Sequence, residues 1–308
     1  MSQTKRKRSL IPTVIVALVG MPLLCMIAFG SYMYFEINRT NGEIISSGQK
    51  RTYLLYVPEN YQSQRPVPLV ICIHSFSQWP AHQMELSQWN QLAEENNFLV
   101  VYPSGTGFPL RWQTDGQTNT LTDVIFIADI IDQLKHEYSI DETRIYVNGL
   151  SNGGGMSFAL ACNLSDRIAA IGSVAGLYLL PWEDCNPARP VPAVIFHGTD
   201  DPIVPFDGGP SSNFNVPFPD ISNWVRTLAV QNGCSETPEE LPAQGDVEGL
   251  RYRDCDQNAE VLFYIINGGG HSWPGGGYLP KVIVGNTTQD IDATEIMWDF
   301  FQEHHIQK

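Results

Sequence analysis

The stretch that most constrains the fold is residues 145–156, which read Ile-Tyr-Val-Asn-Gly-Leu-Ser-Asn-Gly-Gly-Gly-Met. It opens with a short apolar run rich in β-branched and aromatic residues, which is typical of a buried strand. A Gly-x-Ser-x-Gly turn follows, centred on Ser151, and the residues after it favour a packed helix. A turn of this kind between a strand and a helix is strained and exposes the serine hydroxyl at the edge of the sheet. The pattern therefore predicts that Ser151 is a nucleophile. The backbone N–H of Asn152 then lies at a helix N-terminus, where it can stabilise an oxyanion.

The rest of the chain alternates between strand and helix patterns. We expect further strands at residues 51–58, 68–75, 98–102, 169–174, 191–197 and 260–266, and further helices at 88–97, 122–138, 221–231 and 291–305. Asp123 is placed to cap the second of these helices, and residues 103–120 form a long loop without periodicity. The alternation predicts an α/β fold in which a mostly parallel sheet carries helices on both faces. Residues 40–308 are expected to form one catalytic domain.

A serine nucleophile needs a base, and the base needs an acid that orients it. In this fold the order along the chain is serine, acid, histidine. Asp200 and Asp201 follow the strand at 191–197 and compete for the role of the acid. His271 follows the last strand in a glycine-rich loop and is the candidate base. Of the other histidines, His74 is expected to make a supporting hydrogen bond and His197 to be structural.

Aromatic side chains are the candidates for the walls of a substrate pocket. Loop 103–120 carries Trp112, loop 206–218 carries Phe206, and Trp273 follows the candidate base. The same two loops also contain Phe108, Phe214 and Phe218. These rings either stack on the substrate or pack the loops against the domain, and the sequence leaves both roles open.

Beyond Cys25, the chain has five cysteines. Cys72 lies in an apolar run and is expected to be buried as a small hydrophobic residue. The other four lie in polar or loop contexts and allow three pairings. We favour the two pairs that close the shortest loops, Cys162 with Cys185 and Cys234 with Cys255. Disulfides of this kind indicate an oxidising compartment.

The N-terminus carries a second indication of export. Residues 1–9 include the cluster Lys5-Arg6-Lys7-Arg8, and the uncharged, mostly apolar run 10–35 is long enough to cross a bilayer. One interpretation is a cleaved signal peptide with a site near Ala28-Phe29-Gly30. We favour the other, a retained signal anchor, because the apolar run exceeds the usual length of a signal-peptide core. Both place the catalytic domain outside the cytoplasm, because the positive cluster stays inside.

Charge and motifs narrow the function further. The formal net charge of −15 argues against a nucleic-acid partner, which requires a basic face. Neither a His-Glu-x-x-His metal pattern nor a phosphate-binding Gly-x-x-x-x-Gly-Lys pattern occurs in the sequence. We therefore expect no metal and no organic cofactor.

Taken in order, five stretches resemble the extracellular serine esterases of the polyhydroxybutyrate depolymerase and feruloyl esterase group. They are 51–58 (RTYLLYVP), 68–74 (PLVICIH), 144–154 (RIYVNGLSNGG), 197–205 (HGTDDPIVP) and 269–276 (GGHSWPGG). The resemblance covers about residues 42–305 and implies an α/β-hydrolase fold. It also implies Ser151 as nucleophile, Asp201 rather than Asp200 as acid and His271 as base. It supports the two favoured disulfides.

One residue departs from the pattern of that group. Its members have His-Gly after the second strand, and the residue that follows supplies an oxyanion N–H. Here the sequence is His74-Ser75-Phe76, so the second donor falls on Ser75 or Phe76 at a position where serine lacks the backbone freedom of glycine.

Together these features predict an exported serine esterase that acts on small or oligomeric carboxylic esters, such as feruloyl, acetyl or hydroxybutyrate esters. The chain ends soon after its last helix, which favours soluble esters over an insoluble polyester. Three alternatives remain: an acyltransferase with the same triad, a peptidase of the prolyl-oligopeptidase type, and a non-catalytic envelope binding protein on a hydrolase scaffold. The sequence leaves the oligomeric state open.

Overall fold

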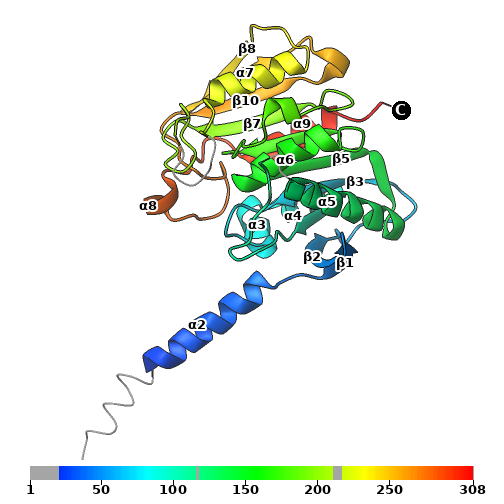
Figure 1. The fold of residues 1–308 in the computed structure, drawn as a ribbon, viewed down its shortest axis with the longest axis vertical. Coiled ribbons are helices and arrows are strands. Elements are labelled where there is room, and N and C mark those ends of the chain that lie inside the picture. The colour runs from blue at the N-terminus through cyan, green and yellow to red at the C-terminus, as the bar shows by residue number, and fades with distance from the viewer. Residues whose placement is uncertain (1–20, 116–117, 211–216, 308) are drawn as a thin grey trace, which may run out of the picture. The chain divides into compact units, whose positions relative to one another are not determined.

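The computed structural model describes residues 21–115, 118–210 and 217–307. The chain divides into two compact units, residues 1–39 and 40–308 (Figure 1). The first unit contains helix α2 (Met21–Ile37). No helix within the described ranges combines the length and the apolar character needed to cross a bilayer. Residues 1–20, which hold the basic cluster and part of the expected anchor 10–35, lie outside those ranges, so the anchor stays a prediction.

The second unit is built on one sheet, which has ten strands within the described residues (Figure 1). In spatial order they are β1 (Gly42–Ser46), β2 (Gln49–Tyr56), β4 (Leu99–Pro103), β3 (Val67–Ile73), β5 (Ile140–Leu150), β6 (Ala170–Val174), β7 (Ala193–Gly198), β10 (Val261–Ile266), β9 (Val247–Tyr252) and β8 (Glu239–Gln244). The run from β4 to β10 is parallel, while the strands at both edges pair antiparallel. The centre of the sheet is therefore the predicted parallel one, and its edges are mixed.

Helices cover both faces of this sheet, as predicted (Figure 1). On one face lie α5 (Thr118–Glu137), α6 (Asn152–Asn163) and α7 (Ile221–Gln231), and on the other α3 (Pro80–Ser87), α4 (Trp89–Asn96) and α9 (Ala293–Glu303). Short helices in the connections are η2 (Trp182–Asp184), η3 (Asp256–Asn258) and α8 (Lys281–Val284). Strand β3 shows the logic, since Leu69 and Ile71 face the first helical layer while Val70 and Cys72 face the second.

Some elements differ from expectation for identifiable reasons. The hairpin of β8 and β9 was not predicted, because β8 reads Glu-Glu-Leu-Pro-Ala-Gln and its side chains are mostly exposed. A polar strand with a proline is typical of a sheet edge and carries no apolar alternation. Helix α5 begins at Thr118 rather than at residue 122. Asp123 therefore does not cap the helix but lies in its second turn, buried against Arg51.

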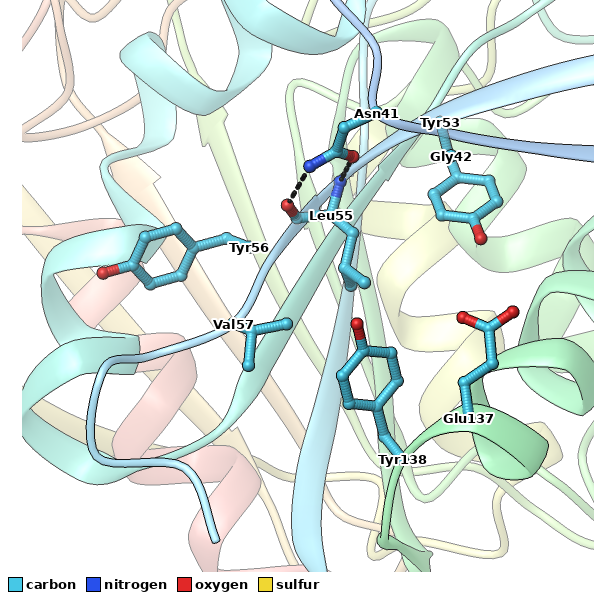
Figure 2. Close-up of a pocket in the computed structure, with 8 residues that line it drawn as sticks. All are labelled: Asn41, Gly42, Tyr53, Leu55, Tyr56, Val57, Glu137 and Tyr138. Carbon is cyan, nitrogen blue, oxygen red and sulfur yellow. Dashed lines mark hydrogen bonds between the residues drawn. The ribbon is translucent and has the colours of Figure 1, made fainter. Parts of the chain in front are cut away.

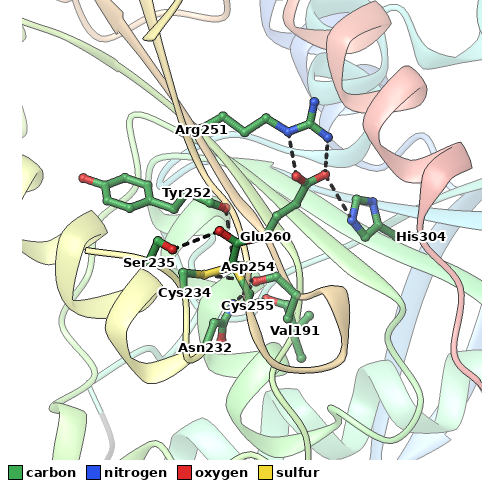
Figure 3. The surroundings of a disulfide bond; sticks show 11 residues. Val191, Asn232, Cys234, Ser235, Arg251, Tyr252, Asp254, Cys255, Glu260 and His304 are labelled. Carbon is green, nitrogen blue, oxygen red and sulfur yellow. Dashed lines mark hydrogen bonds and ion pairs between the residues drawn. A yellow bond between two sulfur atoms is a disulfide. The ribbon is translucent and has the colours of Figure 1, made fainter. Parts of the chain in front are cut away.

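Both favoured disulfides are present. Cys162 at the end of α6 bonds to Cys185 before β7, and Cys234 after α7 bonds to Cys255 after β9 (Figure 3). They close sequence separations of 23 and 21 residues, and in the chain-entropy model loops of this size contribute about 3 kcal/mol each. Cys72 is free and fully buried, as expected.

Candidate active site

Ser151 lies between the end of β5 and the start of α6, in the turn that the motif predicts. Its backbone has φ 57° and ψ −115°, a strained conformation for a residue other than glycine. The glycines on either side leave room for it, because a Cβ at Gly149 or at Gly153 would collide with the carbonyl oxygen of Ile73 on β3. Strand, turn and helix thus fit together only with this spacing of glycines. The Ser151 side chain is held at the carboxyl end of the parallel sheet.

Asp201 and His271 meet at the same edge of the sheet. Asp201 follows β7 and His271 follows β10, and these two strands are parallel neighbours. His271 Nδ1 and Asp201 Oδ2 are 2.7 Å apart and hydrogen-bonded. The bond engages Nδ1, so Nε2 is the ring nitrogen that can exchange a proton with a hydroxyl. The backbone of His271 is fixed by a hydrogen bond from its N–H to the carbonyl oxygen of Val284 at 2.6 Å.

The environment of Asp201 keeps its carboxylate charged. Burial alone would raise the pKa of Asp201, but the hydrogen bond and charge of His271, with smaller contributions from His197 and the N–H of Val204, bring it below its ordinary value. The second oxygen, Oδ1, accepts the backbone N–H groups of Ile203 and Val204, both at 2.8 Å. Asp200, the alternative acid, has an exposed side chain. Of the two candidate aspartates, Asp201 is therefore the one that bonds to His271.

His197 is close to Asp201 but is bonded elsewhere. Its Nε2 lies 2.9 Å from the carbonyl oxygen of Val204, to which it donates. Burial lowers the pKa of His197, although the charge of Asp201 and the hydrogen bond to Val204 oppose this shift. Its Nε2 also lies 3.5 Å from Asp201 Oδ2, farther away than the carbonyl oxygen of Val204. This agrees with the structural role expected for His197.

Two backbone segments offer N–H groups for an oxyanion. Asn152 is the first residue of α6, so its N–H has no helical carbonyl before it to bond. Ser75 and Phe76 follow β3, the neighbour of β5. Ser75 does not have the positive φ that would require glycine; Ser77, two residues later, has φ 62°. The departure from His-Gly thus leaves the backbone at Ser75 unstrained.

Two of the three candidate pocket-wall residues are buried in the domain. Trp112 is 2% exposed and Trp273 is 0% exposed, which favours packing of the loops over contact with a substrate, the two roles that the sequence left open. The indole N–H of Trp273 donates to Thr294 Oγ1 at 2.9 Å, which fixes it inside the domain. Phe206 is half-buried and stacks on Phe263 of β10. Phe214 lies outside the described residues.

Sequence reasoning considered only the backbone N–H of Phe76 and assigned no role to Ile203, yet both side chains are exposed. Phe76, in the second candidate oxyanion segment, is 49% exposed, and Ile203, two residues after Asp201, is 42% exposed. It also missed the side chain of Asn152, which bonds the backbone of Trp112, and the buried Arg51–Asp123 pair behind it. Adjacency to the motifs could have indicated Phe76 and Ile203. The other contacts join residues far apart in the sequence and leave no local pattern.

A pocket of about 390 Å³ lies away from these residues (Figure 2). It is lined by Asn41, Gly42, Tyr53, Leu55, Tyr56, Val57, Glu137 and Tyr138. The phenol groups of two of them already have partners, since Gln133 donates to Tyr53 and Tyr56 donates to Glu94. The pocket contains none of the predicted catalytic or oxyanion residues.

Comparisons with known proteins identify esterases as relatives of this chain. Residues 45–203 match a family described as putative esterase. Feruloyl esterase B of Piromyces equi is 30% identical over 72% of this chain, and the chain spans only 42% of the length of that relative. Feruloyl esterase C of Emericella nidulans is 26% identical, with 86% of each chain covered. The structure of an acetyl xylan esterase from Aspergillus awamori has a TM-score of 0.57 at 17% identity, with 75% of this chain and 93% of that chain covered, which is a likeness of fold.

Proposed function

The chain belongs to the putative esterase family that its residues 45–203 match, and from this premise we propose that it is an exported serine hydrolase of carboxylic esters. One observation carries the proposal: the strained serine turn and the bonded His271–Asp201 pair occupy the same edge of one sheet. Carboxyl ends of parallel strands are where ligand sites form in such folds.

In the proposed first step, Ser151 Oγ attacks the ester carbonyl and His271 Nε2 takes the hydroxyl proton. Asp201 holds the imidazole tautomer through Nδ1–H and stabilises the charged ring. The carbonyl oxygen, now an oxyanion, accepts the N–H of Asn152 and an N–H from Ser75 or Phe76. Collapse of the tetrahedral intermediate breaks the C–O bond of the ester. The alcohol leaves with the proton returned by His271.

In the second step, water replaces the alcohol. The water oxygen attacks the acyl-enzyme carbonyl while His271 takes a proton from the water. The same two N–H donors bind the new oxyanion. The bond to Ser151 Oγ then breaks, the serine regains its proton from His271, and the carboxylic acid is released. Each proton that His271 accepts is given back, so the enzyme ends as it began.

We propose small or oligomeric esters as substrates. Relatives named feruloyl esterase and a structure named acetyl xylan esterase indicate esters of small acids with sugar hydroxyls as the first to test. Phe76, in the proposed oxyanion segment, and Ile203, two residues after Asp201, have exposed side chains that are candidates to contact the acyl or alcohol group. Phe206, half-buried, is the remaining candidate from the aromatic set.

We also propose that the catalytic unit works outside the cytoplasm. Two disulfides support an oxidising compartment, and the basic cluster followed by an apolar run supports export. The length of the apolar run 10–35 favours a retained anchor over a cleaved signal peptide. Alkaline extraction of membranes tests this: the full-length chain should stay in the pellet. Soluble protein that begins near Ser31 would establish cleavage instead.

The activity is tested by incubating the purified full-length protein with p-nitrophenyl acetate and butyrate, methyl ferulate, hydroxybutyrate oligomers and a peptide p-nitroanilide. We expect hydrolysis of at least one ester class and none of the amide. The matched control is Ser151→Ala, which removes the nucleophile alone and should lower the rate to background. Equal ester hydrolysis by this variant, or cleavage of the amide alone, would contradict the proposal.

A further inference from the structure

The side chain of Asn152 grips the backbone of Trp112 at two points. Its Oδ1 accepts the Trp112 N–H at 2.7 Å, and its Nδ2 donates to the Trp112 carbonyl at 3.0 Å. Both residues are buried. The side-chain amide therefore pairs with the Trp112 backbone as a neighbouring β-strand would. It connects the first residue of α6 to a loop residue 40 positions earlier in the chain.

The side chain of Trp112 reaches the other oxyanion segment. Its indole Nε1–H donates to the carbonyl oxygen of His74 at 3.0 Å, and the two rings lie 5.2 Å apart. His74 immediately precedes Ser75 and Phe76, the candidate donors. One residue thus bonds, through its backbone and its ring, to both segments that supply the proposed oxyanion hole.

The His74 ring adds a second connection between loop 104–115 and the segment that contains Ser75. Its Nε2 accepts the Gly105 N–H at 2.9 Å, which leaves the proton on Nδ1 to donate to the Ser75 carbonyl at 2.7 Å. Burial lowers the pKa of His74 to about 4, so the ring is neutral and keeps this tautomer at pH 7. Loop 104–115 is therefore fixed to His74, directly after β3, through Gly105 near its start and Trp112 near its end.

Behind Trp112 the core is built to hold its ring in place. The indole stacks on Phe126 of α5 with centroids 6.5 Å apart. The guanidinium of Arg51 lies 3.9 Å from the centroid of Phe126 and pairs with Asp123 at 2.9 Å. The other oxygen of Asp123 accepts the N–H of Gln113, next to Trp112. The ring and its backbone are thus constrained independently.

We propose that Trp112 is a positioning residue that sets the spacing between the two oxyanion donors. This inference rests on the proposed function, because it concerns the same site. Both donors are backbone N–H groups, so their positions depend on how the two segments are tied together. Trp112 makes that tie, while its own burial keeps it away from the substrate. A misplacement of about 1 Å at such a site can cost about 10²-fold in rate.

The test compares Trp112→Phe with Trp89→Phe. Trp89 is also 0% exposed and also loses an indole hydrogen bond, to Asn148 Oδ1 at 3.0 Å, but it lies in the core on the opposite face of the sheet. It therefore controls for lost packing. A third form carries β-(3-benzothienyl)alanine at position 112, which keeps the size of the ring and removes only its N–H.

For Trp112→Phe and the benzothienyl form, we expect kcat to fall about tenfold or more while KM stays within about twofold. The inhibition constant of an aryl trifluoromethyl ketone, whose adduct with Ser151 places an oxyanion in the hole, should rise by the same factor as kcat falls. Trp89→Phe should keep both constants within about twofold. Equal losses of kcat in the two phenylalanine variants, or a change in KM alone, would overturn the proposal.

Hydrogen exchange supplies a readout that does not depend on activity. The amides of residues 74–77 should exchange faster in Trp112→Phe than in Trp89→Phe at matched stability. If the wild type hydrolyses no ester but this difference is found, the proposed function fails and the tie between the segments stands. If esters are hydrolysed and the exchange rates are equal, the positioning role of Trp112 is wrong and the proposed function stands.

Discussion

The acid and the base bond to each other across 70 residues of sequence, and each is otherwise held by residues near it in the chain. Asp201 accepts the backbone N–H groups of Ile203 and Val204, two and three residues later, and His271 donates its N–H to Val284. The proposed oxyanion segments, in contrast, are held by contacts that span 31 to 40 residues and pass through loop 104–115. We call Asp201, His271 and their contacts the acid–base side, and residues 74–76 and Asn152 with loop 104–115 the oxyanion side. The acid–base side depends on where two neighbouring strands end, and the oxyanion side depends on a network of hydrogen bonds through that loop.

This difference explains which parts of the site a sequence can reveal. The acid–base side is encoded in two short motifs, and the structure brings Asp201 and His271 within 2.7 Å as the order of the motifs suggests. The oxyanion side depends on which distant residues meet. The role of Trp112 could not be read from its neighbours, because an aromatic ring in a long glycine-rich loop is typical of either a pocket wall or an anchor.

The largest effect is expected on the acid–base side. Asp201→Asn should lower kcat by about 10⁴-fold, because the neutral amide no longer fixes the tautomer of His271 or stabilises its charged form. Steady-state kinetics on p-nitrophenyl butyrate measures this. Asp200→Asn is the matched control, since its side chain is exposed, and should stay within about threefold of the wild type. A dead Asp200→Asn variant with an active Asp201→Asn variant would reverse the assignment of the acid.

The second expected effect is a loss of folding stability when the buried Arg51–Asp123 pair behind loop 104–115 is broken. Burial raises the pKa of Asp123 and lowers that of Arg51, so the loss of solvation outweighs their attraction. Removing one partner leaves the other buried and unpaired, and we expect Asp123→Asn to cost about 3–5 kcal/mol in the free energy of unfolding. Urea denaturation at pH 7 measures this.

The control for that experiment is Glu239→Gln, which breaks the surface pair between Glu239 and Arg253, whose side chains are each 51% exposed. It should change the free energy of unfolding by no more than about 0.5 kcal/mol. If the two variants lose equal stability, the buried pair does not brace loop 104–115 and the contrast between the two sides weakens.

The third effect is a loss of stability in acid. The pKa of His74 falls to about 4 through burial, with the Ser75 carbonyl opposing the shift and His82 and Arg51 adding to it. The unfolded chain takes up a proton near pH 6.5, before the folded chain does. The contribution of His74 is therefore complete above about pH 6.5 and is lost as the pH falls to about 4, to a total of about 3 kcal/mol. Urea denaturation from pH 7 to pH 4 measures it.

The matched variant for this pH series is His74→Gln, which cannot take up a proton. The slope of unfolding free energy against pH between about 6.5 and 4 should be smaller in His74→Gln than in the wild type. Parallel slopes in the two proteins would mean that His74 titrates normally, and that loop 104–115 is not held by its neutral ring.

As at the site, the parts of the fold that carry a local sequence pattern were predictable, and the parts without one were missed. Buried strands such as β3 and β10, and helix α7, follow from runs or periodic patterns of apolar residues, and the structure places them within a few residues of expectation. Strand β8 was missed because the polar, proline-containing stretch 239–244 has neither pattern. The start of α5 was missed because residues 118–121 read Thr-Asn-Thr-Leu, which have low helix propensity apart from the leucine.

The account depends most directly on a covalent bond between substrate and Ser151. Rapid quenching of the full-length protein with p-nitrophenyl butyrate, followed by peptide mapping, measures that bond. We predict a butyryl group on the peptide that contains Ser151, formed within the first turnover and accumulating more slowly in Asp201→Asn. An acyl group on another residue, or steady turnover with no acylated peptide at any time, would contradict the account.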